Sequence, residues 1–314
     1  MPQLPSPAGP LFSAVRGISN SRQYITNSHP HNVLHRLNPP TDARERLRQH
    51  FLDHPHSAHT TRWDDLWAAG DFLPWDRGGP NPALVDILRD RQDLVGTPTL
   101  ASSGRRKRAL VPGCGKGYDV LLLASWGYDA YGVESSRNAV KACEEYAARS
   151  GGDYPVVDKE VGKGKAKFLF GDFFEDGWFE GVEKEDGEDT PVFELIYDYT
   201  FLSALPPDLR PAWALRLSQL LSPSASSNLI CLEFPTYKPP NTGGPPWALP
   251  PAVYVQHLSR PGDLVSYGED GHIEEPEDPP KRNEVGLVRI AHWQPEHTHE
   301  IGKGTDWVGV WRHK

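Results

Sequence analysis

Three glycines alternate with other residues in the stretch RALVPGCGKGYD, residues 108–119. Gly113, Gly115 and Gly117 let the backbone turn sharply and approach a ligand closely, because no Cβ blocks the way. The amides of a helix predicted from Tyr118 then face that ligand. A dinucleotide-binding turn would place a glycine at position 118, and a P-loop would end in Gly-Lys-Ser/Thr; neither occurs here. The spacing suits a nucleoside ligand without pyrophosphate, most commonly S-adenosylmethionine, and the alternative is a plain strand-turn-helix connection.

Acidic residues end two of the strands predicted after this turn. Glu134 closes the strand 130–133, where a carboxylate can accept two hydrogen bonds from a ribose diol. Its alternative is a surface glutamate at a strand end. Asp172 and Phe173 follow the strand 167–170, and are placed to bond an adenine amino group and to cover its ring. Asp after Gly is also an ordinary turn residue, so this second prediction has a competing structural explanation.

Asp198 and Tyr199 follow the next predicted strand, 193–197. Ligands of open α/β sheets bind at the carboxyl ends of the strands, near the point beside the first strand where strand order reverses. This strand is therefore expected nearest the reacting centre. An aromatic face there suits a sulfonium through cation–π attraction, and the Asp198 carboxylate can balance the positive charge.

Three tryptophans precede the glycine-rich stretch. Trp63 and Trp67 are four residues apart, on one face of a predicted helix, and Trp75 follows a break at Gly70. Buried aromatic side chains usually serve packing alone. The tryptophans can equally form a lid of flat faces over an adenosine or a sulfonium, and the pattern does not separate the two interpretations.

Strand-like and helix-like segments alternate from the glycine stretch onward. This alternation, with apolar runs rich in β-branched residues, predicts a mostly parallel sheet with helices on both faces. Polar insertions at 151–165, 181–190 and 262–283 are expected to be surface loops. The predicted strands are 109–112, 130–133, 167–170, 193–197, 228–234, 287–292 and 307–311, and the predicted helices are 82–89, 118–126, 136–149 and 207–221.

The overall composition limits the class of protein. The chain has 314 residues, a formal net charge of −9 and three cysteines. A negatively charged surface repels a phosphate backbone, so no nucleic-acid partner is expected. No apolar stretch approaches the ~18 residues that a membrane span needs. Few cysteines, odd in number, favour a reducing compartment. We expect a cytoplasmic monomer without membrane attachment.

Residues 1–60 are expected to be an N-terminal tail, partly disordered, with a short helix at 42–51, ahead of a catalytic domain at 61–314. Arg16, Arg22 and Arg36 precede the first acidic residue, so a mitochondrial presequence is the alternative to an unstructured leader within residues 1–41. The histidines between positions 50 and 59 lack accompanying cysteines, which favours solvated loop histidines over a metal site.

The sequence resembles a known family. Its motifs occur in the same order as those of the thiopurine S-methyltransferase superfamily, and they are most similar to those of the plant and fungal thiol and halide methyltransferases. The resemblance begins near Arg62 and continues to the end of the chain. The motifs that carry it are Trp-x-x-x-Trp at 63–67 with Trp75, VPGCGKGYD at 111–119, GVE at 132–134, GDFF at 171–174, DYTFLSALP at 198–206 and TGGPP at 242–246.

The resemblance implies a Rossmann-like class I methyltransferase fold with a seven-stranded sheet, and S-adenosylmethionine as the cofactor. The tail before Arg62 and the three insertions depart from the family pattern and leave the substrate pocket open to question. The residues that the resemblance places on the cofactor, together with those proposed above, are Trp63, Trp67, Trp75, Gly113, Gly115, Glu134, Asp172, Phe173, Asp198 and Tyr199.

The implied reaction is an in-line methyl transfer to a small thiol, sulfide or halide. Such acceptors need no dedicated base, and none is assigned. Tyr199 is predicted to position the acceptor and the methyl group, with Phe201, Phe72 and Trp247 as further walls of the acceptor pocket. No metal is expected. The alternatives are a methyltransferase with an oxygen, nitrogen or protein acceptor, and a catalytically silent protein that binds S-adenosylmethionine and acts in regulation.

Overall fold

The computed structural model describes residues 39–185, 187–274 and 283–314. Residues 1–38, for which a disordered tail or a presequence is predicted, lie outside the described residues. Residues 275–282 of the acidic loop also lie outside them. The chain divides into Met1–Pro39 and a compact unit, Pro40–Lys314. Everything that follows concerns this second unit.

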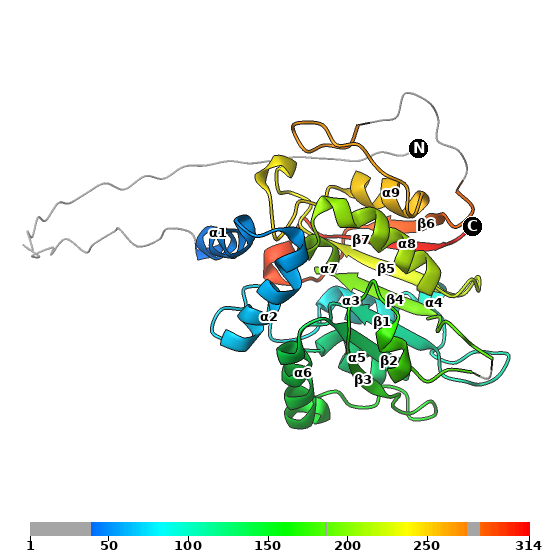
Figure 1. The fold of residues 1–314 in the computed structure, drawn as a ribbon. Coiled ribbons are helices and arrows are strands. Elements are labelled where there is room, and N and C mark those ends of the chain that lie inside the picture. The colour runs from blue at the N-terminus through cyan, green and yellow to red at the C-terminus, as the bar shows by residue number, and fades with distance from the viewer. Residues whose placement is uncertain (1–38, 186, 275–282) are drawn as a thin grey trace, which may run out of the picture. The chain divides into compact units, whose positions relative to one another are not determined.

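Seven strands form one sheet in the order β3-β2-β1-β4-β5-β7-β6 (Figure 1). Neighbours from β3 to β5 are parallel, and β7 is antiparallel to both β5 and β6. The predicted fold class, a seven-stranded mostly parallel sheet, is confirmed. The strands are β1 (Arg108–Pro112), β2 (Asp129–Glu134), β3 (Ala166–Phe170), β4 (Leu195–Tyr199), β5 (Asn228–Glu233), β6 (Leu287–Trp293) and β7 (Trp307–His313).

Polar side chains cap the starts of two helices. The Asn81 side chain accepts a hydrogen bond from the Ala83 amide, and the Ser136 side chain accepts one from the Ala139 amide. No helix in the described ranges is long and apolar enough to cross a membrane. The helices are α1 (Pro39–Leu52), α2 (His59–Ala69), α3 (Pro82–Asp90), α4 (Gln92–Val95), α5 (Tyr118–Ser125), α6 (Arg137–Ser150), α7 (Phe201–Ala204), α8 (Arg210–Leu220) and α9 (Pro251–Ser259).

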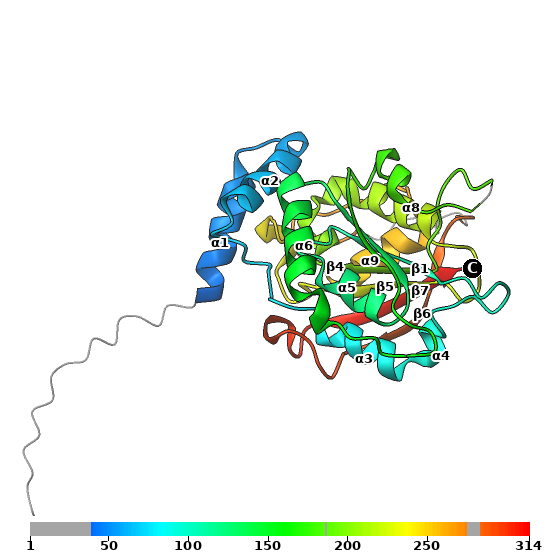
Figure 2. The same ribbon diagram turned by 90° about the horizontal axis from the view of Figure 1, so that it is seen from below.

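The sheet separates two hydrophobic cores. Side chains alternate along a strand, so Leu110 of β1 joins the core beneath α8 and α9, whereas Ala109 and Val111 join the core beneath α3 and α5. Figures 1 and 2 show these helices covering the two faces. Burial on both faces explains why the central strands β1, β4 and β5 are mostly apolar, whereas most of the edge strand β6 is exposed or half-buried.

Three features differ from the sequence predictions. The compact unit begins at Pro40, before the expected boundary at 61, because Leu47 and Phe51 of α1 pack with Trp63 in a small core of their own. The helix predicted at 207–221 is divided into a 3-10 turn, Pro207–Leu209, and α8. Helix α9 was not predicted, since prolines surround its start.

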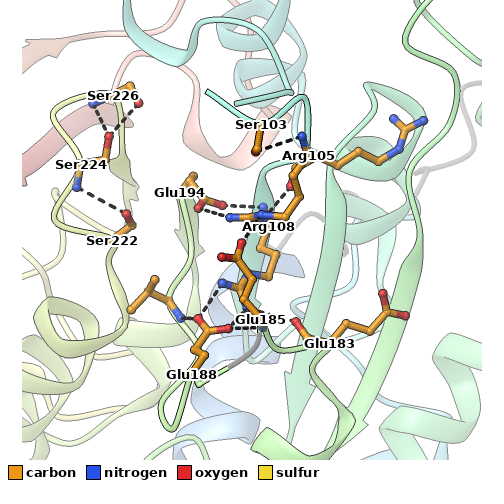
Figure 3. Close-up of polar contacts among 12 residues, drawn as sticks. Ser103, Arg105, Arg108, Glu183, Glu185, Glu188, Glu194, Ser222, Ser224 and Ser226 are labelled. Carbon is orange, nitrogen blue, oxygen red and sulfur yellow. Dashed lines mark hydrogen bonds and ion pairs between the residues drawn. The ribbon is translucent and has the colours of Figure 1, made fainter. Parts of the chain in front are cut away.

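The insertion at 181–190 is tied to the amino ends of the strands (Figure 3). Arg108 at the start of β1 pairs with Glu188 at 2.7 Å, and Arg105, which precedes β1, pairs with Glu185 at 2.5 Å. Arg108 and Glu188 are largely buried, so this ion pair is shielded from salt more than a surface pair would be. The insertion therefore lies at the opposite end of the sheet from the carboxyl ends of the parallel strands.

A buried acid on β5 makes stability depend on pH. Glu233 is fully buried; its Oε2 lies 3.1 Å from Nε2 of His292 and its Oε1 has no partner among the described residues. Burial raises the pKa of Glu233 to about 8 and lowers the pKa of His292, so the pair is neutral. The folded state keeps this proton to higher pH than the unfolded chain does. The free energy of unfolding is therefore expected to fall by about 1–2 kcal/mol between pH 6.5 and 8.5.

Urea denaturation at several pH values measures this slope. Glu233→Gln should reduce the slope by the share that Glu233 contributes, because glutamine does not titrate, whereas other buried carboxylates with raised pKa values, such as Glu134, keep the remainder. Glu45→Gln is a matched control, since the pKa of Glu45 is lowered to about 2 by its bond to Arg48 and it stays ionised throughout this range. Stability that is flat or rising from pH 6.5 to 8.5, or an unchanged slope in Glu233→Gln, would contradict the assignment.

Candidate functional site

A cavity of about 760 Å³ lies at the carboxyl ends of the parallel strands. Its volume is within the range of small-molecule and cofactor sites. The strand ends contribute Gly113, Glu134, Gly171, Thr200 and Phe234, which follow or end β1 to β5. Helices α1 and α2 and the loop after α2 supply another part of the wall. The cavity is therefore where the sequence predicted a ligand site.

The glycine turn has the conformation that its sequence requires. Gly113 has φ 57° and its amide donates to the Val133 carbonyl at 2.9 Å. A Cβ on Gly113 would collide with the Phe201 ring. From α6, the Cys143 thiol donates to the Gly115 carbonyl at 2.7 Å. Gly113 and Gly115 both line the cavity, so the turn forms a cradle that a side chain at Gly113 would fill.

Glu134 points a carboxylate into this cavity. Its Oε2 accepts from the Gly115 amide at 3.2 Å and its Oε1 accepts from the Ser135 amide at 3.0 Å. The residue is only 9% exposed, and burial raises the pKa of Glu134 to about 7. Each carboxylate oxygen has a second lone-pair site, so two further hydrogen bonds from a ligand remain available.

The three predicted tryptophans all line the cavity. Trp63 and Trp75 pack edge to face with ring centroids 5.1 Å apart, and Trp67 packs on Trp75 at 5.7 Å. Trp67 is 8% exposed, which is core-like burial. The two interpretations of these residues are therefore compatible, since the aromatic cluster packs internally and also faces the cavity.

Two carboxylates hold this cover in place. Asp64 of α2 accepts from Ser136 Oγ at 2.6 Å and from Asn138 Nδ2 at 3.1 Å, at the start of α6. Asp76, next to Trp75, pairs with Lys116 at 2.6 Å and accepts from the Tyr118 hydroxyl. The tryptophan-bearing segments are thus fastened to the helix start and to the glycine turn.

Asp172 and Phe173 also line the cavity. Asp172 Oδ1 accepts from the Phe174 amide at 3.0 Å, which is the ordinary turn interaction that competes with a ligand role. The Phe173 ring lies 5.1 Å from that of Phe201 and is 4% exposed. A contact of either residue with a cofactor stays a prediction.

Asp198 and Tyr199 are not among the residues that line this cavity. Asp198 is buried, and its Oδ2 accepts from Trp213 Nε1 at 2.8 Å while its Oδ1 accepts from the Leu202 amide. The Tyr199 ring stacks with His299 instead. The contacts of these two side chains with the cofactor or the acceptor stay predictions, because neither side chain lines the cavity. The hydrogen bonds of Asp198 fix α7 and α8 instead.

The residues after Tyr199 take the expected place. Thr200, with φ 67°, and Phe201 line the cavity at the end of β4. Of the other predicted acceptor walls, Phe72 and Trp247 do not line it; Phe72 stacks under Arg46, and Trp247 lies next to His56.

Sequence reasoning missed a His–carboxylate pair at the cavity. Nδ1 of His56 lies 2.8 Å from Asp208 Oδ2, and His56 lines the cavity. His59, expected in a solvated loop, is 8% exposed on α2 and also lines it. His56 and Asp208 are 152 residues apart, so no local pattern signals their pairing.

Arg77 is a second residue that sequence reasoning missed. It lies two positions after Trp75 and lines the same cavity. Its Nη1 donates to the Pro74 carbonyl at 2.7 Å. Nothing in the spacing of residues 74–78 distinguishes this arginine from a surface one.

Comparisons with known proteins identify the relatives of this chain. The family model described as thiopurine S-methyltransferase matches residues 58–292. A probable thiol methyltransferase 2 of Arabidopsis thaliana is 35% identical over 62% of this chain and 70% of its own length. Thiocyanate methyltransferase 1 of the same plant is 32% identical over 67% of this chain and 77% of its own length.

A solved structure of magnesium protoporphyrin IX methyltransferase from Synechocystis, with S-adenosylhomocysteine bound, is similar with a TM-score of 0.46 and 14% identity, over 82% of this chain and all of that one. The family match covers most of the chain. This protein therefore belongs to the thiopurine S-methyltransferase family, whose methyl donor is S-adenosylmethionine.

Proposed function

We propose that this protein transfers a methyl group from S-adenosylmethionine to a small thiol, a sulfide or a halide ion. The observation that carries the proposal is the cavity that Glu134, the glycine turn and the three tryptophans share. A ribose requires a carboxylate with free lone pairs, and the edge of a nucleoside requires a turn that it can approach closely. A sulfonium requires aromatic faces.

The residues present fit this cofactor. Gly113 provides a cradle that a Cβ would fill, and Glu134 retains acceptor capacity beyond its two amide donors. We assign the ribose hydroxyls to Glu134, the adenine to Asp172 and Phe173, and the sulfonium to the tryptophan faces. When bound, S-adenosylmethionine supplies a methyl group that its positively charged sulfur already activates.

The chain's own residues then have to position the acceptor and exclude water. In this proposal the acceptor is positioned, and water is excluded, by Thr200 and Phe201 together with the cover formed by α1 and α2. An ordinary thiol with a pKa of ~8.5 is a few per cent thiolate at neutral pH and is strongly nucleophilic, so it needs little help from a base. The names of the plant relatives, thiol and thiocyanate methyltransferase, support sulfur acceptors.

A second candidate is a methyltransferase with a small oxygen or nitrogen acceptor. One observation favours it: His56, oriented by Asp208, borders the cavity and is a suitable general base for a weakly acidic acceptor. A silent cofactor-binding protein is a third candidate, but no feature of the cavity favours it.

Mass spectrometry of methylated products tests the proposal. The full chain is incubated with S-adenosylmethionine and, separately, small thiols, hydrosulfide, iodide, a catechol and an amine. We expect methylated thiol or methyl iodide, with matching release of S-adenosylhomocysteine, and none with Glu134→Ala. Methylation of the catechol or amine only, lost in His56→Ala, would favour the second candidate. Tight cofactor binding without any product would favour the third.

A further inference from the structure

The order of the strands divides the cavity into two halves. Glu134 and Asp172 belong to the β2 and β3 side, whereas Thr200, Phe234 and Ile301 belong to the β4, β5 and β7 side. In the proposed function the first half holds the nucleoside. The second half is left for the methyl group and the acceptor.

Arg77 belongs to the side of this second half. The segment that follows it is fastened to the chain before β7, because Asn81 Nδ2 donates to Thr298 Oγ1 at 3.2 Å. Burial raises the pKa of Asp306, which precedes β7, and the nearby charge of Arg77 opposes this shift.

Two arginines line the cavity. Arg44 of α1 donates to the hydroxyl of Tyr237, which follows β5, whereas the Arg77 guanidinium makes no hydrogen bond to a side chain among the described residues.

The guanidinium has no ionic partner among the described residues. Its Nη1 donates to the Pro74 carbonyl, and its buried Nε has no hydrogen-bond partner there. The adjacent Asp76 is occupied by Lys116 and Tyr118. Asp306 accepts from Thr298 at 2.6 Å, and no ion pair joins it to Arg77 in the part of the chain that the structure describes. A cation held in this way is a ready receptor for an anion.

We propose that Arg77 is the anion-binding residue of the acceptor half, and that it selects small singly charged nucleophiles, namely thiolate, hydrosulfide and halide, over neutral acceptors. The inference rests on the proposed function and names its substrate class. An anion bound between Arg77 and a sulfonium is attracted by both positive charges. The electron pair of the anion forms the new bond to the methyl carbon. The electron pair of the broken carbon–sulfur bond stays on the sulfur of the leaving S-adenosylhomocysteine. The acceptor atom and the leaving sulfur are then both uncharged.

Two measurements on the full chain test the proposal. In crystals with S-adenosylhomocysteine and sodium iodide, anomalous scattering should place an iodide beside the Arg77 guanidinium in the wild type and none in Arg77→Gln. In kinetics with a free thiol as the acceptor, perchlorate should inhibit competitively with that thiol. Its inhibition constant should rise about tenfold or more in Arg77→Gln and less in Arg77→Lys. Arg91→Gln, which removes a surface arginine paired with Asp93, should leave it unchanged.

The outcomes separate the alternatives. If Arg77→Gln weakens binding of S-adenosylhomocysteine in calorimetry and leaves perchlorate inhibition unchanged, Arg77 holds the cofactor carboxylate and the proposal is overturned. If the wild type methylates none of the thiols or halides, the proposed function fails, and the iodide position still decides whether Arg77 binds anions. Arg77→Lys keeps the test valid should Arg77→Gln fold poorly.

Discussion

Glu134→Ala is expected to weaken binding of S-adenosylhomocysteine by about 100-fold, measured by calorimetry. The carboxylate is buried in the cavity, and each hydrogen bond from a ribose hydroxyl to a charged acceptor contributes about 1.5–3 kcal/mol. Glu134 also accepts from the Gly115 and Ser135 amides, so the alanine variant additionally leaves the turn without its anchor. Methyl transfer should fall with cofactor affinity.

The matched control keeps the shape of the side chain. Glu134→Gln retains one acceptor oxygen and should lose less affinity than Glu134→Ala. Because burial raises the pKa of Glu134 to about 7, the wild type should bind more weakly as pH falls from 8 to 6, when the carboxylate gains a proton. Glu134→Gln should lack this pH dependence. Wild-type affinity in Glu134→Ala would remove Glu134 from the site.

Gly113→Val is expected to abolish detectable cofactor binding and to lower stability by about 2 kcal/mol or more. The φ of Gly113 is 57°, which a β-branched residue adopts only with strain, and its Cβ would strike the Phe201 ring. Either the turn shifts, which moves the amides of Gly113 and Gly115, or Phe201 is pushed into the cavity. Both results close the space at the end of β1.

Urea denaturation and calorimetry measure the two effects. Gly177→Ala is the control, because nothing lies within 4 Å of a Cβ there and Gly177 does not line the cavity. It should change neither cofactor affinity nor, by more than a few tenths of a kcal/mol, stability. Normal affinity in Gly113→Val would mean that the turn does not form the cradle inferred here.

Much of the fold follows from local patterns. Apolar runs of strand length ending in polar residues predicted the seven strands, because a strand buried on both faces must be apolar throughout. The helices predicted at 82–89 and 136–149 begin next to Asn81 and at Ser136, whose side chains accept from backbone amides that the helix leaves free. The compact unit extends back to Pro40, because Leu47 and Phe51 are buried against tryptophans that follow in the chain, and no local pattern shows this packing.

The sequence by itself determined the strand ends, and with them the neighbourhood of the glycine turn, Glu134, Asp172 and Phe173, because parallel strands bring their carboxyl ends to one edge. Only the tertiary structure decided which side chains reach the cavity. Asp198 ends its strand as Glu134 does, yet it turns to Trp213, because a buried indole N–H requires an acceptor. His56 meets Asp208 across 152 residues, and Arg77 has no ionic partner among the residues that the structure describes. These facts depend on packing between elements distant in sequence, which local spacing does not record.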